Sequence, residues 1–569
     1  MPRFLPFVVT GAMSLALLAC AGQAPHEMAA PTVNAPAEEI VVSSQRADSA
    51  YAYGARKTNG LTRMEPAAPA YAAPPPPPML AVPERRPWPP AYHDVGRDTF
   101  ANKEENRFQI VREQPVSTFS IDVDTASYSF VRASLNQNVL PQPAAVRPEE
   151  MINYFPYNYA APRSIVQPFT THVAVFPSPW TAGRKIIRIG IRGYAVQRAA
   201  RPRANLVFLI DTSGSMNEPN KLPLVKQSLS MLVDQLDPKD HVAIVTYAGS
   251  AGTALEPTPA REKHRILEAI NRLGAGGSTA GAEGIRQAYA LAAANMDPAG
   301  VNRVMLATDG DFNVGITNAD ELKGFVERER GKGIFLSVLG FGMGNYNDAL
   351  MQALAQNGNG AAAYIDTIGE ARKTLVEEAN STLFPIARDV KIQVEFNPAA
   401  VAEYRLVGYE TRMLNREDFD NDRVDAGDVG SGQTVTALYE IVPVGGPRAI
   451  PDLRYGPAAK APVIDAGEYG FVKIRYKAPK SDRSQLIATP INRAVEFARF
   501  ENAPQDARFA TGVAAFAELL RGGRYGGTFG YDDVLRIALA ARGVDPFGYR
   551  GEFIQLVRAA KTAAAMQPL

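Results

Sequence analysis

The chain has 569 residues, 46% of them hydrophobic, and its 60 Lys and Arg balance 59 Asp and Glu to a net charge of +1. At roughly 150 residues per domain, this length predicts three or four folded units. The near-neutral charge gives no sign of the basic surface by which proteins hold nucleic acid, so no nucleic-acid partner is expected.

The first residues indicate an export signal. Residues 4–19 are apolar, but the segment is shorter than the roughly 20 residues of a membrane-spanning helix, which indicates a signal peptide over residues 1–19. Leu17-Leu18-Ala19-Cys20 resembles the bacterial lipoprotein processing box, and Cys20 is the only cysteine in the chain. The resemblance implies lipidation of Cys20 and a lipid-anchored protein of the cell envelope. Because Ala21, and not an Asp, follows Cys20, the resemblance also implies that the protein lies in the outer membrane, on the periplasmic face or at the cell surface. The alternative is an ordinary signal peptide with an incidental cysteine.

Residues 20–100 are rich in Ala and Pro, with consecutive prolines from Pro74 to Pro78. They lack the periodicity of a helix or a strand. Such a composition buries too little apolar surface to offset chain entropy, so we expect a disordered tether that holds the rest of the chain away from the membrane.

An N-terminal α+β region is expected over residues 101–200. Its sequence predicts a strand at 116–124, helices at 125–136 and 148–155, and strands at 169–176 and 185–192.

Residues 203–385 alternate apolar runs with amphipathic stretches. Strands are predicted at 206–210, 242–247, 303–308, 334–339 and 362–365, with a short edge strand at 253–256. Amphipathic helices are predicted between them. This rhythm predicts an α/β domain with a doubly wound parallel sheet.

After this domain the pattern returns to β. Strands are predicted at 390–396, 434–442 and 470–476, within a β-rich region at 386–480. The two strands predicted at 169–176 and 185–192 would be only marginally stable by themselves. We therefore hypothesise that the β-rich region pairs with residues 165–195 in one sandwich, and that the α/β domain is inserted between these two parts of the chain. Residues 481–569 are predicted to form a helical region of structural character.

The predicted strand at 206–210 ends in a cluster of oxygen-bearing side chains: Asp211, Ser213 and Ser215. The carboxyl ends of parallel strands are where ligands bind in such sheets. Oxygen ligands alone suit a hard cation such as Mg²⁺, Mn²⁺ or Ca²⁺. Two more oxygen-bearing residues, Thr279 and Asp309, lie in loops expected at the same edge.

Asp-x-Ser-x-Ser with a distal Thr and a distal Asp-Gly resembles the metal-ion-dependent adhesion site of the von Willebrand factor type A domain. The resemblance implies that Ser213, Ser215 and Thr279 bind the ion directly or nearly so, and that Asp211 and Asp309 act directly or through water. Asp311 is a candidate acceptor behind these ligands, or else a surface turn residue. Mg²⁺ is the expected ion, and an Asp or Glu of a protein partner would fill the open position.

The resemblance extends beyond this domain. Ser120 to Tyr128, Glu149 to Tyr154 and Gly548 to Phe553 are similar to segments of a bacterial family of secreted or lipid-anchored type A domain proteins, with an associated N-terminal region and an uncharacterised C-terminal domain. We therefore expect an envelope protein that binds a partner through the metal. The alternatives are a scaffold with a permanently occupied metal site and a metal-dependent hydrolase. We expect no enzyme, because Ser278 only approximates a nucleophile motif and none of the five histidines has paired-ligand spacing.

Overall fold

A computed structural model gives the fold of the chain. It describes residues 98–121, 124–278, 281–310, 319–344, 346–451 and 467–566. The predicted signal peptide, Cys20 and the expected tether up to residue 97 lie outside the described residues. The described residues all belong to one compact unit. Among the described helices, none combines the length and the apolar character that crossing a membrane requires.

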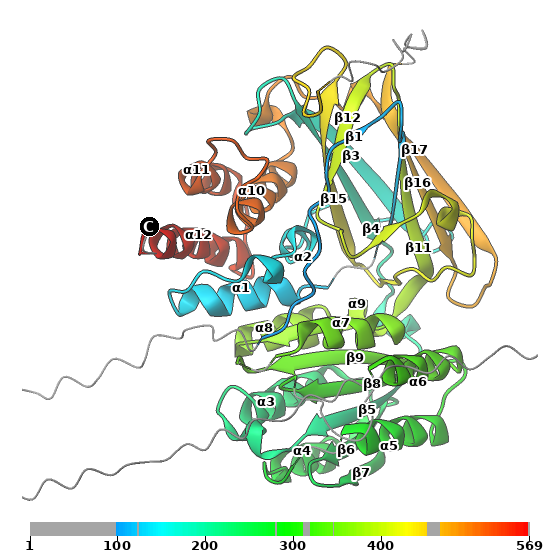
Figure 1. Cartoon of the computed structure of the whole chain (residues 1–569). Coiled ribbons are helices and arrows are strands. Elements are labelled where there is room, and N and C mark those ends of the chain that lie inside the picture. The colour runs from blue at the N-terminus through cyan, green and yellow to red at the C-terminus, as the bar shows by residue number, and fades with distance from the viewer. Residues whose placement is uncertain are drawn as a thin grey trace, which may run out of the picture. The chain divides into compact units, whose positions relative to one another are not determined.

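Six strands form the central sheet of the α/β domain, in the order β10-β9-β8-β5-β6-β7 (Figure 1). They are β5 (Ala204–Asp211), β6 (His241–Tyr247), β7 (Ala251–Pro259), β8 (Val301–Thr308), β9 (Ile334–Phe341) and β10 (Ala362–Ile365). Neighbouring strands are parallel except for β7, which pairs antiparallel with β6. Every residue of β5 and β8 is buried, as expected for apolar strands covered on both faces.

Helices cover both faces of this sheet. One face packs against α3 (Leu222–Gln235), α4 (Lys263–Arg272) and α8 (Ile368–Arg372). The other packs against α5 (Gly281–Ala294), α6 (Ala319–Gly331) and α7 (Asp348–Asn357). A π-helical turn (Lys373–Glu377) and α9 (Ala379–Leu383) then lead out of the domain. The prediction of a doubly wound α/β sheet is confirmed.

Two antiparallel sheets form a β-sandwich around a second core. The first sheet has the order β1-β12-β15-β4-β3, with β1 (Gln109–Ile110), β12 (Val401–Val407), β15 (Thr434–Pro443), β4 (Lys185–Gly193) and β3 (Phe169–Pro177). The second has the order β13-β2-β11-β16-β17, with β13 (Met413–Leu414), β2 (Val116–Ser120), β11 (Pro385–Phe396), β16 (Glu468–Lys477) and β17 (Ser484–Asn492). A short β14 (Val429–Gly430) pairs with β11.

Strands from before and after the α/β domain pair with each other in both sheets. β4 lies beside β15, with Arg192 opposite Thr434. β2 lies beside β11, with Phe119 opposite Ile392. The chain therefore leaves the sandwich to build the α/β domain and then returns, which is the arrangement that the single-sandwich hypothesis requires.

The prediction that the chain is helical from residue 481 is wrong at its start. β17 lies at the edge of the second sheet, and β16 is its one neighbour among the described strands. Pro490 lies inside it, and proline is tolerated in edge strands but not in a helix interior. The C-terminal helices begin only at Gln505.

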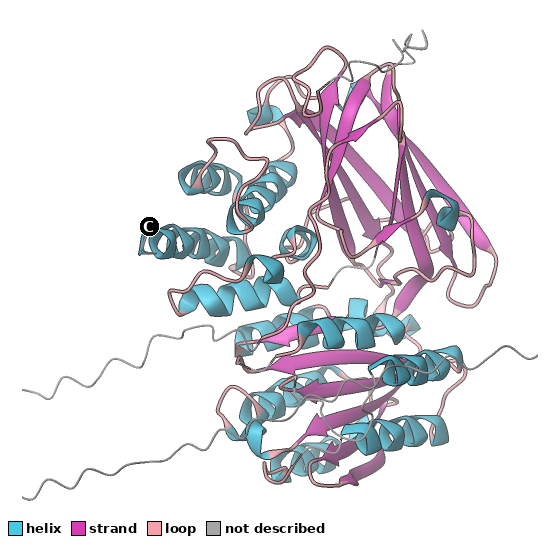
Figure 2. Cartoon of the chain, in the orientation of Figure 1, coloured by secondary structure: helices cyan, strands magenta, loops and turns pink. Residues whose placement is uncertain are grey.

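Three helices end the chain: α10 (Gln505–Leu520), α11 (Tyr531–Ala541) and α12 (Tyr549–Met566). They share a core with residues of α1 (Ala126–Asn136), of α2 (Pro148–Asn153) and of β3, β4 and β15. Figure 2 shows these helices gathered beside the strands of the sandwich.

The expected tether is ordered at its last residues, which is a second correction. Thr99 forms a β-bridge with Asn347, and Asp98 Oδ1 accepts hydrogen bonds from the backbone of Gly344 and Tyr346. Phe100 packs edge-to-face on Phe130, with ring centroids 4.6 Å apart. Aromatic packing and backbone pairing therefore anchor this segment, despite its polar surroundings in the sequence.

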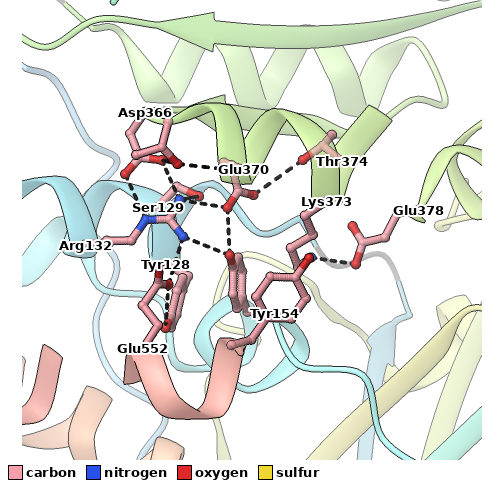
Figure 3. A network of polar contacts seen from close by, with 12 residues as sticks. Tyr128, Ser129, Arg132, Tyr154, Asp366, Glu370, Lys373, Thr374, Glu378 and Glu552 are labelled. Carbon is pink, nitrogen blue, oxygen red and sulfur yellow. Dashed lines mark hydrogen bonds and ion pairs between the residues drawn. The ribbon is translucent and has the colours of Figure 1, made fainter. Parts of the chain in front are cut away.

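A buried polar network joins the α/β domain to the flanking helices (Figure 3). Arg132 of α1 donates from Nη2 to Glu370 Oε2 of α8 (2.8 Å) and from Nε to Asp366 Oδ2 (2.9 Å). Its Nη1 donates to the Tyr154 hydroxyl (2.9 Å) and to Glu552 Oε1 of α12 (3.0 Å). One guanidinium thus holds carboxylates from both regions, and its loss would leave buried charge unpaired.

Candidate metal centre

The central strand β5 ends at the first predicted ligand, Asp211. The backbone N–H of Ser213 donates to Asp211 Oδ1 (2.9 Å), which closes a tight loop after the strand. A short 3₁₀ turn (Gly214–Asn217) follows, and the fully buried Met216 anchors it in the core of the domain. The two hydroxyls, Ser213 Oγ and Ser215 Oγ, lie 3.0 Å apart.

The loop that precedes Thr279 lies against this first loop. Gly276 N–H donates to Thr212 O (2.8 Å), and Gly214 N–H donates to Gly277 O (3.0 Å). Gly277 has a φ of +86°, which favours glycine at this contact. Thr279 itself lies outside the described residues, as does Asp311. The described part of the loop before Thr279 therefore lies beside the site. The roles of the Thr279 and Asp311 side chains stay predictions.

Asp309 reaches the site because β8 lies beside β5. The two strands are parallel, with Ile210 opposite Ala307, so Asp309 follows β8 at the level where Asp211 ends β5. The hydroxyl of Thr308 donates to Asp211 Oδ2 (3.3 Å) and ties the two strand ends together. The structure therefore brings four of the five predicted ligands, Asp211, Ser213, Ser215 and Asp309, to one edge of the sheet.

The two carboxylates are buried, while the site opens to solvent at Ser215. The exposed fraction is 0% for both Asp211 and Asp309 and 2% for Ser213, whereas Ser215 is exposed. Burial raises the pKa of Asp211 to about 6; hydrogen bonds from Ser213 oppose this rise, and the charge of Asp309 adds to it. Two buried acids next to each other create a demand for positive charge.

Lys221 supplies part of that charge, and the sequence patterns did not reveal it. Its Nζ donates to Asp309 Oδ2 (3.1 Å), and both side chains are buried, with 6% and 0% exposed. Its stem lies against Gly342, where an added Cβ atom would clash with Lys221 Cε. The only signal in the sequence was the position of this lysine, directly before α3 and a few residues after the two serines. The direction of its side chain depends on a loop far along the chain, so it could not be predicted.

The donor set fits a hard divalent cation. Neighbouring ligands of an octahedral Mg²⁺, each about 2.1 Å from the ion, lie about 3 Å from one another. The hydroxyls of Ser213 and Ser215 have this separation, 3.0 Å. No group of three or more His, Cys, Asp or Glu side chains among the described residues is placed to hold a metal.

Three family models match the chain. The model described as von Willebrand factor type A domain matches residues 205–378, and one described as von Willebrand factor matches residues 94–188. The model described as Uncharacterized protein YfbK, C-terminal, matches residues 381–563. Uncharacterized protein YfbK of Escherichia coli (strain K12) is 42% identical over 473 residues, which cover 82% of this chain and 81% of that protein. The chain belongs to the YfbK family of bacterial von Willebrand factor type A domain proteins.

Other matches are less similar to this chain. Human inter-alpha-trypsin inhibitor heavy chain H4 is 26% identical over 34% of this chain and 21% of its own length. Among solved structures, a von Willebrand factor type A protein from Catenulispora acidiphila has a TM-score of 0.40 at 16% identity, covering 71% of this chain and 91% of its own. Proximal thread matrix protein 1 from the mussel byssus, whose structure has a zinc-occupied MIDAS motif, has a TM-score of 0.26 at 20% identity, covering 31% of this chain and 45% of its own.

Proposed function

We propose that this protein is a cell-envelope lipoprotein that binds a protein partner through a divalent cation. Asp211, Ser213, Ser215, Thr279 and Asp309 would hold the ion, with Mg²⁺ as the expected species and Mn²⁺ or Ca²⁺ as alternatives. The observation that carries the proposal is the convergence of two buried carboxylates and two serine hydroxyls at a solvent-facing edge of the type A domain.

Charge favours an acidic partner group. Asp211, Asp309 and Lys221 together carry one net negative charge when the two acids are ionised, so a divalent cation would bring the site to one net positive charge. Hydroxyl ligands add no negative charge, and the exposed Ser215 marks the open side. A Glu or Asp carboxylate from a partner would complete the coordination and neutralise the site. Catalysis is not part of this proposal.

The N-terminal segment gives the proposal its location. A lipid on Cys20 would anchor the chain to the outer membrane, and the Ala- and Pro-rich segment after it would hold the metal face away from the bilayer. Labelling with a palmitate analogue, compared between wild type and Cys20→Ser, tests the anchor. The anchor proposal fails if the two proteins incorporate equal label.

A pull-down from envelope extract tests the binding function. The bait is the whole chain, used in Mg²⁺, in excess chelator, and as the Asp211→Ala variant, with Asp234→Ala on the exposed face of α3 as the matched control. We expect one partner to be retained by wild type and by Asp234→Ala in Mg²⁺, and lost in chelator and by Asp211→Ala. A partner that survives both chelator and Asp211→Ala would instead indicate a scaffold whose binding does not use the metal face.

A further inference from the structure

A second site candidate lies far from the metal loops. A cavity of about 630 Å³ is lined both by the start of the α/β sheet strands and by the sandwich loop that precedes β15. Arg303, near the start of β8, lines it, whereas Asp309 of the metal site follows the end of the same strand. At about 3.3 Å per residue, the two residues are about 20 Å apart.

Arg303 is buried without an ion pair to any described carboxylate. Its exposed fraction is 3%. Its Nη1 donates to Ser337 Oγ (2.6 Å), its guanidinium carbon lies 5.6 Å from the Phe335 ring centroid, and its Nε has no hydrogen-bond partner among the described residues. Burial lowers its pKa to about 10, although Asp428 is near enough for its charge to oppose this. An unpaired buried charge is costly, so its retention needs a reason.

A second arginine reaches the same cavity from the sandwich. Arg192 of β4 lines it, and its buried Nε has no hydrogen-bond partner within the described part of the chain. Two other arginines of the lining are neutralised: Arg330 pairs with Asp425 (2.7 Å) and Arg412 with Asp124 (2.8 Å). Within the described residues, the lining thus contains two guanidinium groups with an ion pair and two without one.

Acidic side chains of the lining are already engaged. Glu378 accepts from Lys373 Nζ (2.5 Å), Glu377 accepts from the Tyr549 hydroxyl (2.5 Å), and Asp428 Oδ1 accepts from the backbone N–H of Asp389 (3.3 Å). These contacts leave Arg303 and Arg192 as the donors with the largest unmet demand for an anion.

We propose that this cavity binds a small ligand bearing a carboxylate or phosphate group, which Arg303 and Arg192 hold between the α/β domain and the sandwich. Guanidinium groups recognise both oxyanions through paired N–H donors. A volume of about 630 Å³ is in the range of small-molecule sites. The ligand would bridge the two parts of the chain, and its binding would not depend on the metal.

Calorimetry on the whole chain tests this site. After metal removal on a chelating resin, the protein is titrated with inorganic phosphate and, separately, with citrate, against sodium chloride of equal ionic strength. We expect saturable binding of at least one of the two, with a higher midpoint of thermal unfolding. The anion that binds more tightly identifies phosphate or carboxylate as the preferred group.

Two variants and a control test the assignment to these arginines. Arg303→Met and Arg192→Met should each weaken the binding at least tenfold, whereas Arg272→Met, at an exposed position of α4, should not. Arg303→Met removes an unpaired buried charge, so the ligand-free variant should unfold at or above the wild-type midpoint. The proposal is overturned if neither anion binds saturably, or if binding survives both substitutions. If Arg303→Met does not fold, undiminished binding by Arg192→Met is enough to overturn it.

Discussion

A lysine lies beside the two buried carboxylates of the proposed cation site, and its charge would affect how a cation binds there. Lys221 donates to Asp309 Oδ2, while both oxygens of Asp211 accept hydrogen bonds from Ser213 and Thr308. The ammonium therefore lowers the negative charge available to an incoming ion, and it also stabilises Asp309 in the absence of metal. Through these two effects Lys221 would modulate the affinity of the proposed site for its cation, in addition to the predicted ligands.

Lys221→Met should separate the two effects. Without the ammonium, Mg²⁺ should bind more tightly, because the site gains one negative charge, and the metal-free protein should be less stable, by about 3 kcal/mol, because Asp309 loses its buried partner. Calorimetric Mg²⁺ titration and urea unfolding measure the two quantities. Lys226→Met, whose amine donates to Asn271 O near the surface, is the control. Weaker Mg²⁺ binding in Lys221→Met would mean that the lysine instead positions Asp309.

Glu149 should make stability depend on pH. Burial, together with the charges of Glu410 and Glu150, raises its pKa from 4.5 to about 7. The folded protein then holds a proton that the unfolded chain releases near pH 4.5, so this group's effect on stability is most favourable below pH 4.5 and becomes unfavourable as pH rises through 7.

Glu149→Gln cannot ionise and should remove this dependence. At pH 8 the variant should be more stable than wild type by roughly 1–3 kcal/mol, and at pH 5 the difference should become small. Urea unfolding at both pH values measures it. Glu150→Gln should have the opposite effect at pH 8, because Glu150 pairs with Arg147 and accepts a hydrogen bond from Ser127 N–H. A Glu149→Gln protein that is less stable than wild type at pH 8 would contradict this account.

At the scale of elements, the sequence predicted the strands that contain an uninterrupted apolar run. β5 has such a run at 206–210 and β8 at 304–307, and the predicted ranges lie within the observed strands. β12 was not predicted because it carries charged residues at buried positions: Glu403 pairs with Arg448, and Arg405 pairs with Glu440. Partners so distant in sequence cannot be recognised from a local pattern.

The metal site shows the same limit: local spacing was recognised in the sequence, but a contact with a distant loop was not. Asp211, Ser213 and Ser215 could be grouped by their spacing, and Asp309 joined them because parallel strands end at a common edge. Lys221 could not be added to this group from the sequence, because the direction of its side chain depends on the space left at Gly342. The apolar pattern also failed at residues 484–492, where Pro490 and an edge position favour a strand over the predicted helix.

Two apolar residues of β17 differ in burial, so their replacement should differ in its effect on stability. Ile491 is fully buried, whereas Leu486 is 58% exposed. Ile491→Ala should therefore destabilise the protein by about 2–4 kcal/mol, and Leu486→Ala by less than about 0.5 kcal/mol. Chemical unfolding of both variants measures this difference. Equal losses would contradict the orientation of the strand.

At the scale of the whole molecule, the chain is held together by contacts between segments far apart in sequence. Arg132 lies at the centre of one such set, between Asp366 and Glu370 of the α/β domain and Glu552 of the last helix. A second set of such contacts forms where the chain returns to the sandwich after the α/β domain, because β15 pairs with β4 and β11 pairs with β2. A fragment that ends before residue 200 lacks these partners.

Arg132→Met should weaken this junction. Asp366 and Glu370 would be left buried without their cation, so we expect a loss of about 3–5 kcal/mol in the free energy of unfolding. Arg107→Met removes an exposed pair with Glu104 and should change it by less than about 1 kcal/mol. Urea unfolding compares the two variants. Similar stabilities would mean that the network does not hold the parts together.

The central claim, a divalent cation held at the end of β5, is tested most directly by Mg²⁺ calorimetry. Wild type is compared with the Ser213→Ala/Ser215→Ala double variant, whose fold is checked by circular dichroism. Removing two hydroxyl ligands from a surface loop should leave the fold intact and weaken Mg²⁺ binding at least tenfold. Equal Mg²⁺ affinity in the two folded proteins would contradict the site.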